Sequence, residues 1–170
     1  MSDDNSPRSR TLTWQDPLIG AAAFKSMSGI DYLRGWLEGK HSPAPMSLWC
    51  NMRLLEVEAG RVIFTAQAGE EHYNTLGTVH GGFSATVLDT ALGCSVMSVT
   101  PIELAYTTVQ LNVSLVRAIT TTTGVLRAIG EVIHAGRKLA TAEAKLIDAD
   151  GKLYAHGTTT CLVFPREGTA

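Results

Sequence analysis

One aspartate stands out among the residues that could carry chemistry. Asp89 is the only charged side chain between residues 81 and 102, in a segment rich in apolar residues. Aspartate disfavours a helix interior, and burying its charge is costly unless the carboxylate is paired or hydrogen-bonded. We interpret Asp89 as a carboxylate held in a partly desolvated place, where it could serve as a base or nucleophile. The simpler alternative is that Asp89 reaches solvent or a neighbouring backbone N–H.

A second candidate group, His80-Gly81-Gly82, begins nine residues before Asp89, at the expected start of the same helix. Helix N-termini carry N–H groups without intrahelical partners and the positive end of the helix dipole. Two glycines would let a carbonyl oxygen approach these N–H groups and be polarised, as in an oxyanion hole. Alternatively, the glycines only make a tight turn between two elements.

The distance between the two groups limits how they could cooperate. Gly82 and Asp89 would lie about 10 Å apart along the helix axis. One substrate could touch both only if it lies along the helix, or if the helix of another subunit contributes. The second arrangement anticipates a dimer.

The element that carries both groups is a predicted helix over residues 80–99. Its apolar residues cover most of the circumference, which is typical of a buried helix. One side carries Phe83, Val87, Ala91 and Cys94, and the adjoining side carries Leu88, Leu92, Ser95 and Val99.

Strands are predicted on both sides of this helix. Residues 108–115 alternate polar and apolar side chains with a period of two. Further strands are expected over 48–57, 61–68, 123–133, 138–147 and 152–163, joined mostly by short turns. The strand at 138–147 places Ala140, Ala142 and Ala144 on one face, where a helix can approach closely. These features predict an α+β fold, with an antiparallel sheet of about six strands wrapped around one central helix.

The N-terminal region has a different pattern. Residues 1–12 are polar and expected to be frayed. Asp16-Pro17 is a helix-start signal, and the helical pattern is interrupted near Gly29 before it resumes. Residues 39–45 are interpreted as a linker. We therefore divide the chain into a disordered N-terminus with a helical extension (1–45) and one folded domain (46–166).

Composition excludes several classes of protein. The 170 residues hold 14 Lys and Arg against 16 Asp and Glu, a net charge of −2, without the basic stripe of a nucleic-acid binder. No apolar run approaches the ~20 residues that span a bilayer. The three cysteines are an odd number and well separated, which suggests buried thiols in the cytoplasm.

Other familiar catalytic patterns are missing from the sequence. No Cys or His spacing indicates a metal site. Residues 82–86 lack the final glycine of a nucleophile elbow, and Gly39-Lys40 does not belong to a phosphate-binding loop. No dinucleotide-binding fingerprint is present.

The residues around the helix start do resemble a known family. Residues 74–82 read N-x-x-G-x-x-H-G-G, and Asp89 follows His80 by nine residues. This pattern resembles the PaaI-like acyl-CoA thioesterases of the hotdog fold. The likeness continues through 108–113, 136–138 and 150–153, and it covers about residues 47–164.

The resemblance implies a thioester hydrolase that needs no cofactor and no metal. Asp89 would be the nucleophile or the general base that activates water, and the Gly82 N–H would polarise the thioester carbonyl. Asn74 would hold the water or the carbonyl, and Thr108 would contact the same water. His80 would orient the loop. Substrate contacts are expected from Gly81 and, for the phosphates of coenzyme A, from the two basic residues Arg137 and Lys138.

In this family the catalytic groups come from two subunits, so the resemblance implies a homodimer, and a dimer of dimers beyond it. The substrate would be a medium-chain or aromatic acyl-CoA. Two other hypotheses stay open. One is a non-catalytic hotdog protein that binds acyl-CoA as a sensor. The other, a hotdog hydratase, is disfavoured because no histidine follows Asp89 before His134.

Overall fold

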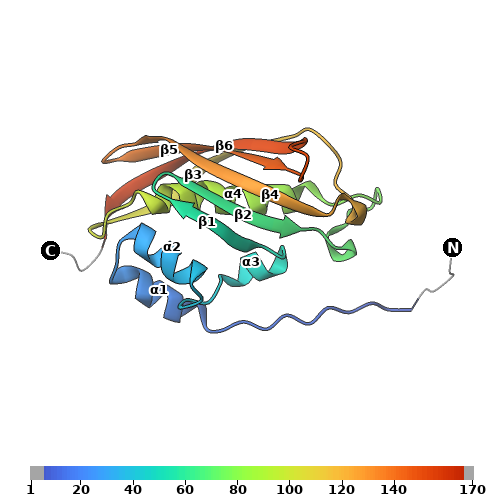
Figure 1. The fold of residues 1–170 in the computed structure, drawn as a ribbon, viewed down its shortest axis with the longest axis horizontal. Coiled ribbons are helices and arrows are strands. Elements are labelled where there is room, and N and C mark those ends of the chain that lie inside the picture. The colour runs from blue at the N-terminus through green and yellow to red at the C-terminus, as the bar shows by residue number, and fades with distance from the viewer. Residues whose placement is uncertain (1–5, 167–170) are drawn as a thin grey trace.

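The computed structural model describes residues 6–166 (Figure 1). Four α-helices and six strands follow one another, with short 3₁₀ turns at Glu70–His72 and Thr121–Thr123. The helices are α1 (Pro17–Lys25), α2 (Gly29–Leu37), α3 (Pro45–Trp49) and α4 (Gly81–Ser98). The strands are β1 (Arg53–Glu58), β2 (Arg61–Gln67), β3 (Leu104–Leu115), β4 (Val125–Ala135), β5 (Leu139–Ile147) and β6 (Leu153–Pro165). None of these helices is long and apolar enough to cross a membrane.

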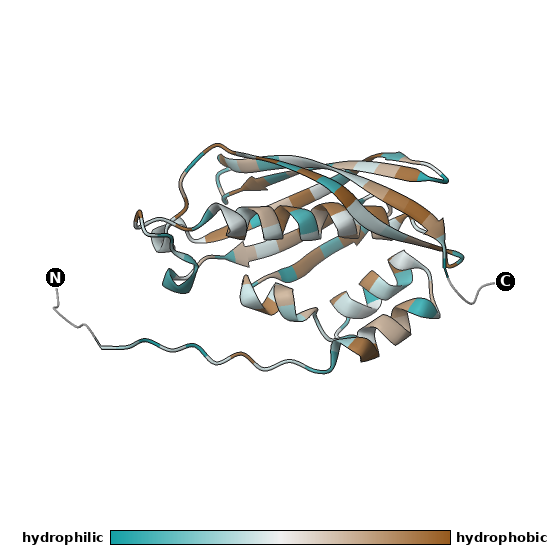
Figure 2. Ribbon diagram, turned by 180° about the vertical axis from the view of Figure 1, so that it is seen from behind, coloured by the Kyte–Doolittle hydropathy of each residue, from teal (hydrophilic) through white to brown (hydrophobic). Residues whose placement is uncertain are grey.

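The six strands form one antiparallel sheet in the order β1-β2-β4-β5-β6-β3. α4 lies across one face of the curved sheet, while α2 and α3 lie beside β1 and α1 packs against α2 (Figures 1 and 2). The expected α+β architecture, a six-stranded sheet around one central helix with an N-terminal helical segment, is confirmed. β3 is the last strand of the order, so one of its edges is unpaired among the described residues.

The core is the interface between α4 and the sheet. Four apolar side chains of α4 have no solvent exposure: Val87, Leu88, Ala91 and Leu92. On the sheet side, Ala140, Ala142 and Ala144 of β5 are buried as the sequence pattern predicted. Because these side chains are short, the helix packs closely against the strand.

The first strand is shorter than predicted. Residues 45–49 form α3 rather than the beginning of a strand, so β1 starts at Arg53 instead of residue 48. Pro45 occupies the first helical position, and Asn51 reverses the chain with a φ of +50°. The apolar residues of 46–49 match a single helical turn as well as a strand, since so short a run carries no decisive period.

The N-terminal helices begin where the sequence indicated. The Asp16 carboxylate accepts the Leu18 N–H at 2.9 Å and caps α1, and Ser28 caps α2 just before Gly29. Residues 6–16, called the N-terminal strap below, form no helix or strand before this cap. Residues 1–12 were expected to be frayed, and residues 1–5 of this segment lie outside the described residues. The division of the chain at residue 46 stays a prediction.

Arg166 fastens the helical extension to the sheet. Its side chain is buried, donates to the carbonyls of Phe24, Met27 and Leu104, and lies over the Phe24 ring at 4.3 Å. The residue that follows β6 therefore holds the junction between α1 and α2 against the beginning of β3.

Gly130 marks a place where the backbone of α4 approaches the sheet closely. A Cβ at this position in β4 would lie 2.3 Å from the Ala91 carbonyl oxygen, so the helix backbone would have to move. We expect Gly130→Ala to lower the free energy of unfolding by about 1 to 3 kcal/mol, measured by urea denaturation. Gly93→Ala is the control, because its new Cβ would meet only ordinary contacts, the nearest at 3.6 Å. Equal stability of the two variants would contradict the close approach.

Candidate active site

Asp89 lies in the middle of α4 and is half-buried. The Thr108 hydroxyl, from β3, donates a hydrogen bond to Asp89 Oδ1 at 3.3 Å. The structure therefore brings together two of the residues that the sequence singled out, and it places them beside the strand that ends the sheet. A carboxylate that accepts one hydroxyl hydrogen bond and is not fully buried keeps lone pairs for a water molecule.

The Asp89 carboxylate contributes to raised pKa values in the side chains around it. Burial raises the pKa of the Cys94 thiol to about 12, and the Asp89 carboxylate adds to this effect. The pKa values of Tyr106 and Cys161 are also raised, first by burial and in smaller part by Asp89. Cys94 and Cys161 are free thiols that stay protonated near neutral pH. Because the thiolate is the nucleophilic form of cysteine, these two thiols are poor nucleophiles.

β3 follows α4 along its length in the opposite direction. At the start of the helix, a Cβ on Gly81 would lie 2.5 Å from Leu115 Cδ1, which explains why glycine stands there. In the middle, Asp89 contacts Thr108, and the Tyr106 hydroxyl lies beside Gly93. Gly81 thus serves the packing of β3 against the helix start, whatever further contact it makes.

His80 caps the start of α4. Its Nδ1 accepts the Gly82 N–H at 2.9 Å, and its own backbone N–H donates to the His72 carbonyl at 2.8 Å. The Gly82 N–H that the sequence assigned to a thioester carbonyl is therefore engaged by His80 in this structure. A carbonyl oxygen bound there would take the place of His80 Nδ1 as the acceptor.

Asn74 organises the loop that leads into the helix. Its Oδ1 accepts the N–H of Leu76 at 2.8 Å, and its Nδ2 donates to the Thr78 hydroxyl at 3.2 Å. This side chain lines a surface hollow together with His80 and Gly81. The structure places Asn74 near the start of α4 and connects it to Thr78 rather than to Asp89.

The two basic candidates, Arg137 and Lys138, are exposed in the turn between β4 and β5. Arg137 lines a hollow with Val96 and Thr100, at the C-terminal end of α4. Within one chain this turn is therefore at the opposite end of the helix from Gly82.

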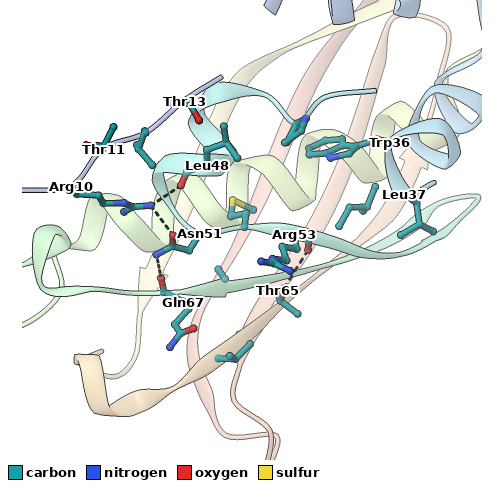
Figure 3. A pocket seen from close by; sticks show the side chains of 16 residues that line it. Arg10, Thr11, Thr13, Trp36, Leu37, Leu48, Asn51, Arg53, Thr65 and Gln67 are labelled. Carbon is teal, nitrogen blue, oxygen red and sulfur yellow. Dashed lines mark hydrogen bonds between the residues drawn. The ribbon is translucent and has the colours of Figure 1, made fainter. Parts of the chain in front are cut away.

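A cavity of about 370 Å³ opens directly at the start of α4. Gly82, Phe83 and Thr86 line it from the helix, and Met46 and Trp49 line it from α3. Met46 and Trp49 were not among the predicted site residues, because no helix was expected over 45–49 and a strand was predicted to begin at residue 48. A larger cavity of about 880 Å³ lies between the strap, α2 and the β1–β2 hairpin (Figure 3), but none of the predicted site residues lines it.

No metal site accompanies these residues. Over residues 6–166, no group of three or more His, Cys, Asp or Glu side chains is arranged to hold a metal ion.

This arrangement of fold and helix can be compared with known proteins. Residues 76–155 match the thioesterase superfamily. The matched segment holds the start of α4, Asp89 and Thr108, and the six-stranded sheet around α4 is the hotdog fold. No curated protein matches the sequence.

Solved structures share this fold over most of the chain. A phenylacetic acid degradation-related protein from Ralstonia eutropha JMP134 is 26% identical, with a TM-score of 0.70, covering 77% of this chain and 98% of its own. A thioesterase family protein from Silicibacter pomeroyi is 23% identical, with a TM-score of 0.70 and coverages of 79% and 99%. A hypothetical thioesterase protein from Streptococcus pneumoniae TIGR4, solved with coenzyme A, is 23% identical, with a TM-score of 0.64 and coverages of 71% and 93%.

The cap of α4 can be tested by substitution. His80→Ala removes the acceptor of the Gly82 N–H, so we expect the free energy of unfolding to fall by about 1 kcal/mol. His80→Ser, whose hydroxyl can accept the same N–H, should recover most of that loss. Urea denaturation of both variants measures the effect, and equal stability of His80→Ala and the unmodified protein would show that the hydrogen bond is not a cap.

Proposed function

We propose that this protein is an acyl-CoA thioesterase of the PaaI-like type, hydrolysing a medium-chain or aromatic acyl-CoA to the free acid and coenzyme A. The observation that carries the proposal is the half-buried Asp89 of α4, which accepts a hydrogen bond from the Thr108 hydroxyl of β3. A cavity opens at the N-terminus of the same helix. A match to the thioesterase superfamily over residues 76–155 supports the same chemistry.

The hydrolysis needs only groups that this chain supplies. In the general-base form, Asp89 takes a proton from water while the water oxygen attacks the thioester carbon. The carbonyl electron pair moves to oxygen, where the Gly82 N–H and the helix dipole stabilise the negative charge. The C–S bond then breaks, and the leaving thiolate of coenzyme A takes the proton from Asp89.

A nucleophilic form gives the same products. Asp89 attacks the carbonyl carbon directly and expels the thiolate, and water then hydrolyses the mixed anhydride. In either form Thr108 orients the carboxylate, Asn74 holds the water or the carbonyl, and His80 orients the loop. His80 also releases the Gly82 N–H when the carbonyl binds, since one N–H cannot serve both acceptors well.

The proposed site is shared between two chains. Gly82 and Asp89 lie about 10 Å apart along one helix, which is too far for a single reacting carbonyl. Antiparallel pairing of β3 with the β3 of a second copy would relate the two strands by a two-fold axis. Because β3 runs opposite to α4, the end near Thr108 in one subunit would lie beside the end near Leu115 and Gly81 in the other. A dimer thus brings Asp89 of one chain toward the helix start of its partner.

The free edge of β3 supports this pairing. A 12-residue edge strand presents a row of unpaired backbone groups, which favours pairing with another chain. Its large apolar side chains are also exposed: Val109 by 57% and Leu115 by 57%. We propose a homodimer through this edge and a dimer of dimers as the complete assembly.

Coenzyme A is the proposed leaving group. Arg137 and Lys138 offer two exposed cations for its phosphates, although the net charge of the chain is −2. That a fold relative from Streptococcus pneumoniae was solved with coenzyme A supports this assignment. The three buried, free thiols are consistent with a cytoplasmic enzyme, as proposed from the sequence.

Replacing Asp89 tests the proposed chemistry. We expect Asp89→Asn to lower kcat for acyl-CoA hydrolysis by about 100-fold or more, because it removes the base while keeping the shape of the side chain. Released thiol measures turnover, and Asp150→Asn, in the exposed β5–β6 turn, is the control. Unchanged turnover in Asp89→Asn would refute the role of the carboxylate. If the unmodified protein binds acyl-CoA but hydrolyses none of a chain-length panel, the sensor hypothesis replaces the enzyme.

The dimer through β3 has its own test. Val109→Glu places a charge on the exposed edge strand, so we expect the solution mass to fall from at least twice the 18.2 kDa chain mass to one chain, with loss of hydrolysis. Ile133→Glu is the matched control, since Ile133 on β4 is 60% exposed. Light scattering coupled to size exclusion measures the mass. A Val109→Glu monomer with full activity would contradict the shared site, and an unaltered mass would contradict the β3 interface.

A further inference from the structure

We infer that Tyr106 is a further catalytic residue of the proposed hydrolysis, whose hydroxyl holds the attacking water beside Asp89 in the space that Gly93 leaves open. The inference rests on the proposed thioesterase function and deepens its general-base form. Neither Tyr106 nor Gly93 was among the predicted site residues.

Tyr106 lies on the same side of β3 as Thr108, two residues earlier in the strand. On α4, Gly93 follows Asp89 by four residues and shares its face of the helix. Because β3 runs opposite to α4, Thr108 meets Asp89 through its 3.3 Å hydrogen bond, and Tyr106 meets Gly93 one turn further along. The phenol and the carboxylate thus belong to neighbouring helical turns, about 6 Å apart along the axis.

The Tyr106 hydroxyl is a protonated donor. Burial raises the pKa of this partly buried phenol well above its usual value, and the neighbouring Cys94, Cys161 and Asp89 raise it further. Over residues 6–166, no atom accepts its proton in a hydrogen bond. The hydroxyl oxygen is not completely enclosed, so a water molecule can reach it. A tyrosine hydroxyl away from bulk solvent gains free energy from such a partner.

Asp89 offers an oxygen to the same water. Thr108 donates to Oδ1, and within the described part of the chain no group donates to Oδ2. An ionised carboxylate accepts hydrogen bonds at both oxygens. A water between the two side chains would donate one hydrogen to Asp89 and accept the O–H of Tyr106. One lone pair of the water is then left to attack the thioester carbon.

Gly93 leaves room for this water. It is buried in the interior of α4, where alanine would favour the helix more than glycine does. Apart from the helix backbone, only Tyr106 lies within 4 Å of a Cβ built at this position, its hydroxyl at 3.6 Å and Cε2 at 3.8 Å. These are ordinary contacts, so packing does not require glycine here. A Cβ would tilt toward the helix N-terminus, and hence toward Asp89, so its absence keeps the space beside the phenol open.

Tyr106 lies at the end of β3 where the carbonyl is expected. In the proposed dimer, the end of β3 that carries Thr108 lies beside the helix start of the partner. Tyr106 belongs to this end of the strand. A water held by Tyr106 and Asp89 therefore lies on the side from which the partner would present the thioester carbonyl.

The phenol keeps its proton during the reaction. As the water oxygen attacks, one water proton passes to Asp89 and the carbonyl electron pair moves to oxygen. The C–S bond then breaks, and the thiolate takes the proton from Asp89. Tyr106 contributes a hydrogen bond that fixes the water before attack, which lowers the entropy cost of the step. Direct attack by Asp89 would not use this water in its first step, so the arrangement favours the general-base form.

Removal of the hydroxyl tests Tyr106. We expect Tyr106→Phe to lower kcat for acyl-CoA hydrolysis by about tenfold or more with KM nearly unchanged, because the ring stays and only the contact to water is lost. Tyr154→Phe is the matched control, since that hydroxyl donates to Asp148 Oδ2 at 3.2 Å, in the β5–β6 turn. Equal effects of the two substitutions would overturn the role of Tyr106.

Competition between two nucleophiles separates the positioning of water from a general structural defect. With hydroxylamine present, the acyl group passes either to water, giving the acid, or to hydroxylamine, giving the hydroxamate. Tyr106→Phe should raise the ratio of hydroxamate to acid severalfold, because only the water loses its hydrogen bond. A structural defect would lower both products together, and an unchanged ratio would contradict the water site.

Filling the space tests Gly93. Gly93→Ala should unfold at a urea concentration no lower than that of the unmodified protein, because alanine favours the helix and meets only ordinary contacts. It should nevertheless hydrolyse acyl-CoA at least about tenfold more slowly, because the methyl group takes the place of the positioned water. Full activity of Gly93→Ala would show that the space holds no water that the reaction needs.

A spectroscopic measurement separates this inference from the proposed reaction. The chain has four tyrosines, so ¹³C labelling of their Cζ atoms gives signals among which Tyr106→Phe identifies one. If a water links the phenol to Asp89, the Tyr106 signal should shift as the carboxyl titrates, and both Asp89→Asn and Gly93→Ala should reduce the shift. If no thioester is hydrolysed, the proposed function fails, yet this shift would still support the water site. A Tyr106 signal that does not respond to Asp89 would overturn the inference even in an active enzyme.

Discussion

The hydrogen bond from Thr108 to Asp89 joins the one charged side chain of α4 to the last strand of the sheet. A helix that packs against five strands has little surface left on which a carboxylate can stay hydrated. The Asp89 side chain contacts β3, the strand at the edge of the sheet, and stays half-buried there, so that solvent or a second chain can reach it. The proposed chemistry therefore depends on the position of β3 in the sheet as much as on the aspartate itself.

Because β3 and α4 run antiparallel, one strand can contact both the Asp89 carboxylate and the start of the helix. The same strand contacts the carboxylate through Thr108 and the helix start through Leu115. Any two-fold pairing of β3 must then exchange these two ends between subunits. In the proposed function, dimerisation follows from placing the proposed base and the helix N-terminus on one rigid element of 18 residues.

Elements that are long enough to show a clear hydrophobic period were predictable from the sequence. The apolar residues over 80–99 cover most of a helical circumference and predict a helix, and the alternation over 108–115 predicts a strand. The small residues of β5 indicate where the helix packs against the sheet. α3 was missed because five residues cannot distinguish the two periods, and the reversal at Asn51 is a feature of the folded backbone. The family likeness implied that Asp89 and Thr108 serve one water molecule, and the direct hydrogen bond between their side chains is seen only in the structure. The hydrogen bond from Gly82 to His80 depends on a rotamer that no sequence pattern encodes.

The contacts of Arg10 show why the cavity wall was hidden from sequence reasoning. Arg10 lies in a polar segment that was expected to be frayed. Two of its partners are backbone carbonyls about 40 positions later, which leave no trace in residue type. Once formed, these bonds make the strap, α3 and the 70–73 segment one connected unit, since Arg10 and Arg8 pair with Glu71 and Glu70 there. Linked hydrogen bonds of this kind stabilise one another. The cavity at the start of α4 thus takes much of its shape from α3 and the 71–73 segment, whereas Asp89 lies in the middle of the helix.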